Sequence, residues 1–253
     1  MNALGKARRG QHDYLNPFKT MANLADFLYL YDHAHHDVSK LHCERLISQT
    51  RRGIELTLRD KTAVYGWSGG KDSVVLEYIL RPFGLHGVCA LTQLEYPIVE
   101  HFVQRFCPPL VKVVRTEHGI EWLKRNPRFL LPRDTRTKSE WYKIVQQNGL
   151  DDFAHERFAS LVVTGRRRSD GNSIPSLIYT PKNAPTRYAP LMNFTHAEVW
   201  AIMRHYELPE YPLYTLHPTS LITGTGCWAQ EPSWEIVKGT DRELFERVRP
   251  QFL

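Results

Sequence analysis

The feature that most constrains this chain is a single polar run, Ser68-Gly69-Gly70-Lys71-Asp72-Ser73. An apolar stretch at 63–67 precedes the run and predicts a buried strand, and the stretch at 74–80 that follows it predicts a helix with an apolar face. A glycine-rich turn between a strand and a helix is a ready anion site. Backbone N–H groups converge there, and the helix dipole adds partial positive charge. The run therefore predicts a loop that holds phosphate or a similar anion.

The side chains of this run suit that task. The two glycines lack Cβ atoms, so an anion can approach the backbone closely. Lys71 supplies a positive charge, and Ser68 and Ser73 supply hydroxyl donors. Asp72 can cap the helix or hold a Mg²⁺ ion that bridges phosphates. The alternative is a glycine turn with chance polar neighbours, and the strand–loop–helix context argues against it.

The run differs from the Gly-x-x-x-x-Gly-Lys-Ser/Thr loop of Walker-type nucleotidases. It resembles the signature of the PP-loop ATP pyrophosphatases, enzymes that cleave ATP between its α and β phosphates, usually to adenylate a substrate. The resemblance implies that residues 68–73 hold the phosphates of an adenine nucleotide.

Strand-like and helix-like runs alternate around this motif. Strands are expected at about 62–67, 86–92, 110–115 and 161–164, and helices at about 73–81, 97–107, 119–125, 137–147 and 150–158. Such alternation predicts an α/β fold with a parallel twisted sheet and helices on both faces. Right-handed crossovers place ligands at the carboxyl ends of the strands, where the motif leaves its own strand.

A second candidate site follows the strand at 161–164, in Thr164-Gly165-Arg166-Arg167-Arg168-Ser169-Asp170-Gly171. Gly165 lets the chain turn, and the arginines then lie at the ligand edge of the sheet, where their fork geometry suits phosphate or sulfate. A solvated basic loop is the alternative interpretation. Further on, Thr195 and Glu198 form a capping box ahead of a Val-Trp helix.

A strand ending in Thr-Gly-x-Arg, a Pro-Leu before a threonine-capped Val-Trp helix, and then Leu-Pro and Leu-Tyr are similar to the phosphoadenosine phosphosulfate (PAPS) reductase and ATP sulfurylase branch of the PP-loop group. The similarity covers about residues 60–215. It implies an adenine nucleotide alpha hydrolase-like fold, with the nucleotide across the ends of the first two strands. It also implies nucleotide contacts from Gly165, Arg166 and Arg167, and catalytic roles for Lys71, Ser68 and Arg166.

The function that the resemblance implies is adenylyl or sulfonucleotide chemistry at an α-phosphate, on ATP or a PAPS-type nucleotide with Mg²⁺. Such a reaction would make the chain a transferase of sulfur metabolism. PAPS reductases carry a cysteine in a C-terminal Glu-Cys-Gly-Leu-His, whereas residues 228–253 contain none and the nearest cysteine is Cys227. Reductase activity is therefore not expected. Two alternatives stay open: a nucleic-acid sulfur-modification enzyme that uses ATP, and a non-catalytic subunit that retains the fold.

Three parts are expected along the chain: an N-terminal arm and helical segment at 1–58, the nucleotide-binding domain at 59–215 and an irregular C-terminal tail at 216–253. The segment from 22 to 58 predicts one long helix or two helices joined near 33–37. The histidines between His33 and His42 present either a metal site or a polar helix surface, and the polar surface is favoured.

The remaining inferences concern environment and partners. A net charge of +6 suits polyanionic ligands, but does not by itself show nucleic-acid binding. No run of about 18 apolar residues exists, so no membrane helix is expected. The cytoplasm is the expected location, and a viral or particle-associated location stays open. The four cysteines form no Cys-x-x-Cys pair, so neither a disulfide framework nor an iron–sulfur cluster is expected. A partner subunit and a homo-oligomer both stay open.

Overall fold

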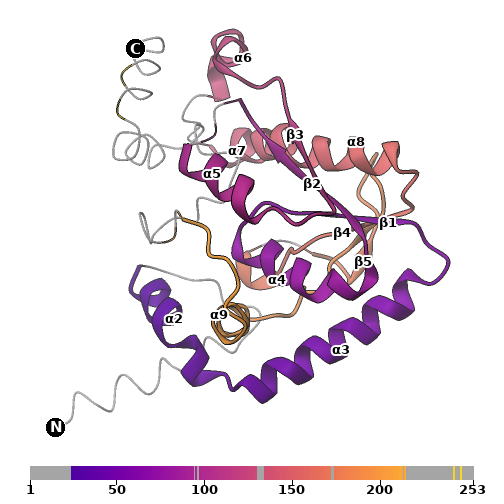
Figure 1. The fold of residues 1–253 in the computed structure, drawn as a ribbon. Coiled ribbons are helices and arrows are strands. Elements are labelled where there is room, and N and C mark those ends of the chain that lie inside the picture. The colour runs from indigo at the N-terminus through magenta and orange to yellow at the C-terminus, as the bar shows by residue number, and fades with distance from the viewer. Residues whose placement is uncertain are drawn as a thin grey trace. The chain divides into compact units, whose positions relative to one another are not determined.

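The computed structural model describes residues 24–93, 95, 97–129, 134–171, 174–212, 214, 242 and 246 of the chain. The strands belong to a mostly parallel six-stranded sheet flanked by helices, which confirms the predicted α/β class (Figure 1). The chain divides into two compact units, each assembled from separate stretches. The first unit draws on 1–63, 71–85 and 159–209, and the second on 64–70, 86–158 and 210–253.

The second unit contains three parallel strands in the order β3-β2-β1. They are β1 (Ala63–Gly66), β2 (His86–Leu91) and β3 (Val111–Arg115). Its helices are α5 (Pro97–Phe106), α6 (Ile120–Arg125), α7 (Thr135–Tyr142) and α8 (Asn148–Glu156). Helix α8 lies along β2 (Figure 1). A parallel strand that is covered by a helix needs apolar side chains, and the residues of β2 from Val88 to Leu91 are mostly buried.

The first unit contains the other strands, in the order β4-β6-β5. They are β4 (Leu161–Val163), β5 (Ile178–Tyr179) and β6 (Arg187–Tyr188); β6 is parallel to β4 and antiparallel to β5. Its helices are α2 (Leu24–Asp37), α3 (Lys40–Leu58), α4 (Lys71–Leu80) and α9 (His196–His205). Short 3₁₀ turns lie at Arg81–Phe83 and Arg168–Asp170 in this unit, and at Pro127–Phe129 in the second unit.

Helix α2 packs against α9 in the first unit (Figure 1). Trp200 is fully buried, and its ring meets those of Phe27 and Tyr31 edge-on at 5.7 and 5.1 Å between centroids. Arg204 lies over the Tyr31 ring at 4.2 Å and donates to the Tyr31 carbonyl. Edge-to-face aromatic pairs add to the gain from burying apolar area, so this cluster anchors the N-terminal helix.

The predicted elements are confirmed, with boundaries that differ by a few residues. The predicted helical segment contains two helices, because α2 ends at Asp37 and α3 begins at Lys40. Ser39 caps α3 by accepting from the His42 N–H at 3.2 Å. The predicted helix at 137–147 is α7 followed by a π-helical segment, Lys143–Gln147. The strands β5 and β6 are additions that the sequence interpretation lacked, since each spans only two residues.

Two further expectations concern the ends of the chain and membranes. The predicted arm at residues 1–20 lies outside the described residues, as does the predicted tail at 216–253 except for Arg242 and Glu246. Among the described helices, none has the length and apolar composition that crossing a membrane requires.

Candidate functional site

The predicted loop is present between a strand and a helix. Ser68–Gly70 follow β1 and belong to the second unit, whereas Lys71 opens α4 in the first unit. Lys71 and Ser73 are buried, and Ser68 and Gly70 are half-buried. The motif therefore spans a point where the chain passes from one unit to the other.

In the second unit, aromatic side chains pack tightly against the loop. Gly69 adopts a left-handed φ of 75°, and a Cβ there would lie 2.8 Å from Cε1 of Phe102. Phe102 stacks on Trp67, with planes 3° apart, and Trp67 is only 3% exposed, so it belongs to the core. A Cβ on Gly70 would lie 3.5 Å from the hydroxyl oxygen of Tyr214. Only glycine satisfies both the backbone conformation and the space at position 69.

In the first unit, the two charged residues of the motif pair with each other. Nζ of Lys71 donates to Oδ2 of Asp72 at 2.8 Å, and Oδ1 of Asp72 lies 2.6 Å from Nε of Arg167. Burial opposes ionisation of Asp72, but the positive charges of Arg167 and Lys71 outweigh it and lower the pKa of that carboxyl. Asp72 is therefore a carboxylate that lies between two cations.

The loop after β4 lies directly against the start of α4. A Cβ on Gly165 would lie 3.0 Å from the carbonyl oxygen of Asp72. The absence of a Cβ therefore allows the loop to approach the backbone of α4 closely. Arg166 is half-buried, and its Nη1 donates to the Tyr179 hydroxyl at 3.4 Å. Arg168 donates to Oδ1 of Asn193 at 3.1 Å near the surface. The structure thus brings the second predicted site to Lys71 and Asp72.

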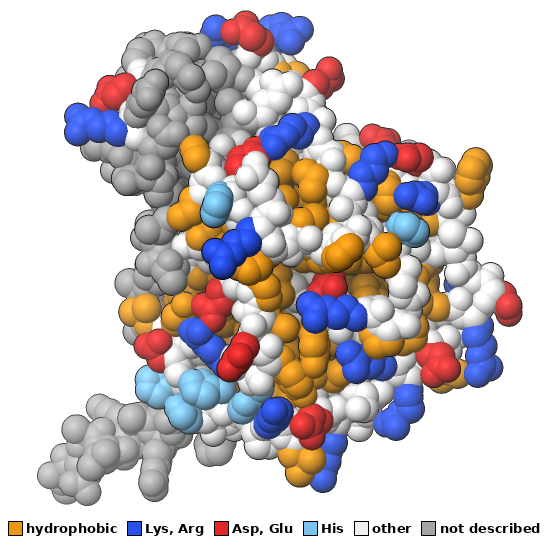
Figure 2. Space-filling view, in the orientation of Figure 1, with side chains coloured by type: hydrophobic (Ala, Val, Ile, Leu, Met, Phe, Trp, Pro, Cys, Tyr) orange, Lys and Arg blue, Asp and Glu red, His pale blue; other side chains and the backbone are white. Residues whose placement is uncertain are grey.

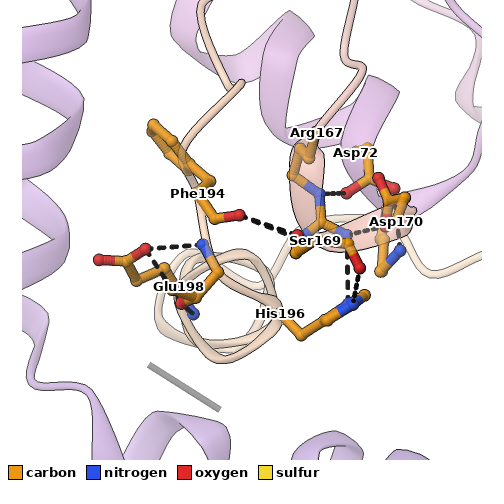
Figure 3. Close-up of polar contacts among 9 residues, drawn as sticks. Asp72, Arg167, Ser169, Asp170, Phe194, His196 and Glu198 are labelled. Atoms are coloured by element: carbon orange, nitrogen blue, oxygen red, sulfur yellow. Dashed lines mark hydrogen bonds and ion pairs between the residues drawn. The ribbon is translucent and has the colours of Figure 1, made fainter. Parts of the chain in front are cut away.

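Arg167 differs from its two neighbours because it has no exposed surface. Besides Asp72, its guanidinium contacts Ser169 Oγ at 2.8 Å, the Phe194 carbonyl at 3.3 Å, Asp170 Oδ1 at 2.5 Å and His196 Nδ1 at 3.2 Å. Figure 3 shows these side chains converging on the guanidinium. We call Asp72, Arg167, Ser169, Asp170 and His196 the arginine network.

Two titratable members of the arginine network have displaced pKa values. Burial, with help from the charges of Arg167 and Lys71, lowers the pKa of His196 to about 3, so its ring is neutral. Its Nε2 lies 2.8 Å from the Ser169 carbonyl. A carbonyl can only accept, so the proton is on Nε2, and Nδ1 accepts from Arg167. Burial and the neighbouring Asp72 charge raise the pKa of Asp170.

The carboxylate proposed for magnesium does not fit that role. Both oxygens of Asp72 lie within 2.8 Å of a cationic nitrogen, and a Mg²⁺ ion would have to displace Lys71 or Arg167. Over the described ranges, no group of three or more His, Cys, Asp or Glu side chains is arranged to hold a metal ion. We therefore derive no chemical step through a metal at Asp72.

The histidines at the start of the chain form a surface cluster. Figure 2 shows histidine side chains gathered over the region of α2 and α3. The rings of His35 and His36 lie 3.9 Å apart, and burial and this neighbour lower the pKa of His35. His42 instead contacts Glu198 at 2.8 Å. The cluster shows no metal-site arrangement in the described residues, and Cys227 lies outside them.

Sequence reasoning did not assign roles to several residues of this site. Ser169 and Asp170 stood within the basic loop, but their contacts to Arg167 depend on a turn that the sequence does not reveal. His196 follows the predicted cap Thr195 directly, and its position at the first turn of a helix was the one available signal. Tyr214, beside Gly70, had only the Leu-Tyr pattern to mark it.

The fold and the loop define the class of the molecule: it is a nucleotide-binding PP-loop protein with a mostly parallel sheet. The profile of the phosphoadenosine phosphosulfate reductase domain matches residues 62–231. The chain belongs to this family, as the sequence resemblance predicted. Among curated proteins, none matches the chain significantly.

Solved structures that align with this chain include three of different stated function. PAPS reductase from Candida auris, in a phosphate complex, aligns with a TM-score of 0.53 at 15% identity over 70% of this chain and 92% of that chain. NH3-dependent NAD synthetase from Campylobacter jejuni aligns with a TM-score of 0.49 at 14% identity over 83% and 93%. A predicted subunit of tRNA methyltransferase from Methanocaldococcus jannaschii aligns with 0.40 at 19% identity over 72% and 92%. At 15% identity the similarity to the Candida auris PAPS reductase shows the fold alone.

Proposed function

We propose that this chain is an enzyme that binds ATP or a related adenylate such as PAPS and cleaves or forms a bond at the α-phosphate. Its reaction would be a transferase step of sulfur metabolism. Family membership supports the nucleotide class, and the intact motif at 68–73 supports a phosphate contact. Release of sulfite through a C-terminal thiol is not part of the proposal.

One observation carries the proposal: the loop after β4 lies on the first turn of α4. Gly165 approaches the Asp72 carbonyl, and Arg167 pairs with the Asp72 carboxylate. Lys71 and Arg166 therefore belong to neighbouring segments, and two cations close to a helix N-terminus favour a polyanion.

Each residue would have a simple task. Lys71 would neutralise charge on the phosphates, and Arg166 would hold the sulfate or the distal phosphates. Ser68, Ser73 and the N–H groups of the loop would orient the anion. In adenylyl transfer an acceptor oxygen attacks the α-phosphorus, and pyrophosphate leaves with the electron pair of the broken bond. Cations that face the leaving pyrophosphate stabilise the charge that develops there.

The test follows the products and the binding of ATP. Wild-type protein with ATP and MgCl₂ should yield AMP and pyrophosphate, not ADP and phosphate. ATP at a hundredfold excess over its dissociation constant should stabilise the fold by about 2.7 kcal/mol. Lys71→Ala should remove most of that stabilisation and the turnover, because the variant lacks the phosphate contact. The measurements are product chromatography and thermal unfolding with and without ATP.

The matched control is Lys112→Ala. Lys112 is a half-exposed lysine of the second unit that pairs with Glu156 at 2.9 Å. The Lys112→Ala variant should keep both the turnover and the ATP-induced increase in unfolding temperature. If ATP raises the unfolding temperature of Lys71→Ala as much as that of the wild type, the phosphate site is contradicted. Binding by the wild type without any turnover would favour the alternative of a non-catalytic subunit.

A further inference from the structure

Three consecutive arginines follow Gly165, and the structure places them in three different environments. Arg166 and Arg168 are half-buried, with contacts to Tyr179 and Asn193. Arg167 has an exposed fraction of 0%. A side chain that binds a soluble ligand needs a path to it, so the sequence pattern alone overstates how many of these arginines can serve the ligand.

The guanidinium of Arg167 has protein partners at every nitrogen. Nη1 donates to Ser169 and the Phe194 carbonyl, and Nη2 donates to Asp170 and His196. Nε forms an ion pair with Asp72 at 2.6 Å that lacks hydrogen-bond geometry. A guanidinium carries five N–H donors. A ligand oxygen that approached this group would have to displace one of these contacts and would leave a buried acceptor without its donor.

The partners of Arg167 are themselves fixed in place. His196 is neutral, donates to the Ser169 carbonyl and stands at the first turn of α9. That turn is closed by a capping box, in which Thr195 and Glu198 bond each other's backbone N–H. Arg167 is therefore held by groups that are themselves hydrogen-bonded, and Figure 3 shows these contacts around its guanidinium.

The network continues from Arg167 to the motif through a single carboxylate. Oδ1 of Asp72 faces Arg167, and Oδ2 accepts from the ammonium of Lys71. Fixing one oxygen of a planar carboxylate also fixes the other. Arg167 thereby determines where Asp72 can hold the Lys71 ammonium, although no direct contact between Arg167 and a ligand is needed.

We propose that Arg167 is a positioning residue: it orients Lys71 through Asp72 and does not contact the ligand, whereas Arg166 does. This inference rests on the proposed function in so far as Lys71 binds a phosphate. It divides the three arginines by task, and it reassigns Arg167 from the ligand-binding role that the sequence predicts.

A double-mutant cycle with ATP as the probe separates the two roles. Arg167→Lys should weaken ATP binding about tenfold in the wild-type background, and less than twofold in the Lys71→Ala background, because the effect passes through Lys71. Arg166→Ala should weaken ATP binding by similar factors in both backgrounds, because it acts on the ligand independently. Titration calorimetry at one fixed ionic strength measures all the affinities.

A ligand-free measurement tests the same geometry. An amine-reactive reagent followed by mass spectrometry reports how accessible each lysine is. Arg167→Lys should speed the labelling of Lys71 several-fold, because Asp72 no longer holds the ammonium in place. Lys112, an exposed lysine paired with Glu156, should label at an unchanged rate and serves as the internal control for the reactivity of the reagent.

A milder variant covers the case in which Arg167→Lys fails to fold. His196→Gln keeps an amide that can donate to the Ser169 carbonyl but places no acceptor at the Nδ1 position, so it removes one contact to Arg167 and should give the same pattern with smaller factors. Equal losses of ATP affinity for Arg167→Lys in both backgrounds, or unchanged Lys71 labelling, would overturn the positioning role. If the wild type binds no ATP, the proposed function fails, and the labelling rates then decide on the positioning of Lys71 by themselves.

Discussion

At the scale of single residues, the half-buried carboxylate of Asp72 and the buried carboxylate of Glu95 have opposite pKa displacements. Asp72 faces two cations, and its pKa is lowered despite burial. Glu95 is 6% exposed, and its Oε1 accepts from the neutral donors of Thr92, the N–H at 3.2 Å and the hydroxyl at 3.1 Å. Its Oε2 has no hydrogen-bond partner in the described part of the chain. Burial accordingly raises the pKa of Glu95 to about 7.

Glu95→Gln should make the protein more resistant to rising pH. The pKa of Glu95 is raised from its usual 4.5, so the folded state binds the proton more tightly than the unfolded state. Its contribution to stability is present below pH 4.5 and is lost as the pH rises to about 7. In that window the variant should gain up to about 1.4 kcal/mol per pH unit relative to wild type. Urea unfolding at pH 4.5, 6 and 8 measures the gain.

The control for this prediction is Glu156→Gln, which changes an exposed carboxylate. Its pKa is lowered by the hydrogen bond from Lys112, so it should not show the same gain with pH. A Glu95→Gln variant whose stability runs parallel to wild type from pH 4.5 to 8 would show that Glu95 titrates normally.

At the scale of elements, helix α9 connects the arginine network to the rest of its unit. Its capping box satisfies N–H groups at the helix start, and Glu198 also accepts from Nε2 of His42 on α3 at 2.8 Å. Its buried face carries Trp200, whose ring packs against two aromatic rings of α2. The same helix therefore holds His196 at one end and anchors the N-terminal helices along its length.

Thr195→Ala should destabilise the protein by about 1 kcal/mol, because it removes the side-chain oxygen that accepts from the Glu198 N–H at 3.1 Å. Thr195→Ser keeps that oxygen and should stay within a few tenths of a kcal/mol of wild type. Chemical unfolding at pH 7.5 compares the three proteins. Equal destabilisation by both substitutions would show that the methyl group of Thr195, which is 3% exposed, matters more than the cap.

At the scale of the whole molecule, two buried groups have opposite effects on how stability depends on pH. The pKa of His196 falls from 6.5 to about 3, so its contribution is present above pH 6.5 and is lost as the pH falls toward 3. The contribution of Glu95 is instead lost as the pH rises from 4.5 to 7. Between pH 4.5 and 6.5 the slopes of unfolding free energy against pH that these two groups cause are opposite in sign, so they cancel in the wild type.

Removing either titratable group should reveal how the other one makes the unfolding free energy depend on pH. Between pH 4.5 and 6.5, His196→Asn should change the slope of unfolding free energy against pH by about −1.4 kcal/mol per unit, and Glu95→Gln by about +1.4. If the two groups titrate independently, the double variant should regain the wild-type slope. Urea unfolding at four pH values measures the slopes. Single variants whose curves stay parallel to the wild-type curve would refute the cancellation.

The sequence determined the elements and the position of the glycine-rich loop, because those depend on local patterns. The apolar run at 63–67 and the glycines after it predict a strand and a turn wherever they occur, and α4 begins at Lys71 as that pattern requires. The capping box of Thr195 and Glu198 was readable for the same reason, since both partners lie within one helical turn. The alternation of runs then sufficed for the α/β class.

Only the tertiary structure decided what the side chains do at the site. Three adjacent arginines are equivalent in the sequence, yet Arg167 is buried and faces a carboxylate from a helix 95 positions earlier in the chain, Asp72. Similarly, the raised pKa of Glu95 is caused first by burial, which depends on the packing around the residue. Burial and long-range ion pairs depend on distance in space, so a pattern of residue types cannot reveal which charge meets ligand, solvent or another charge.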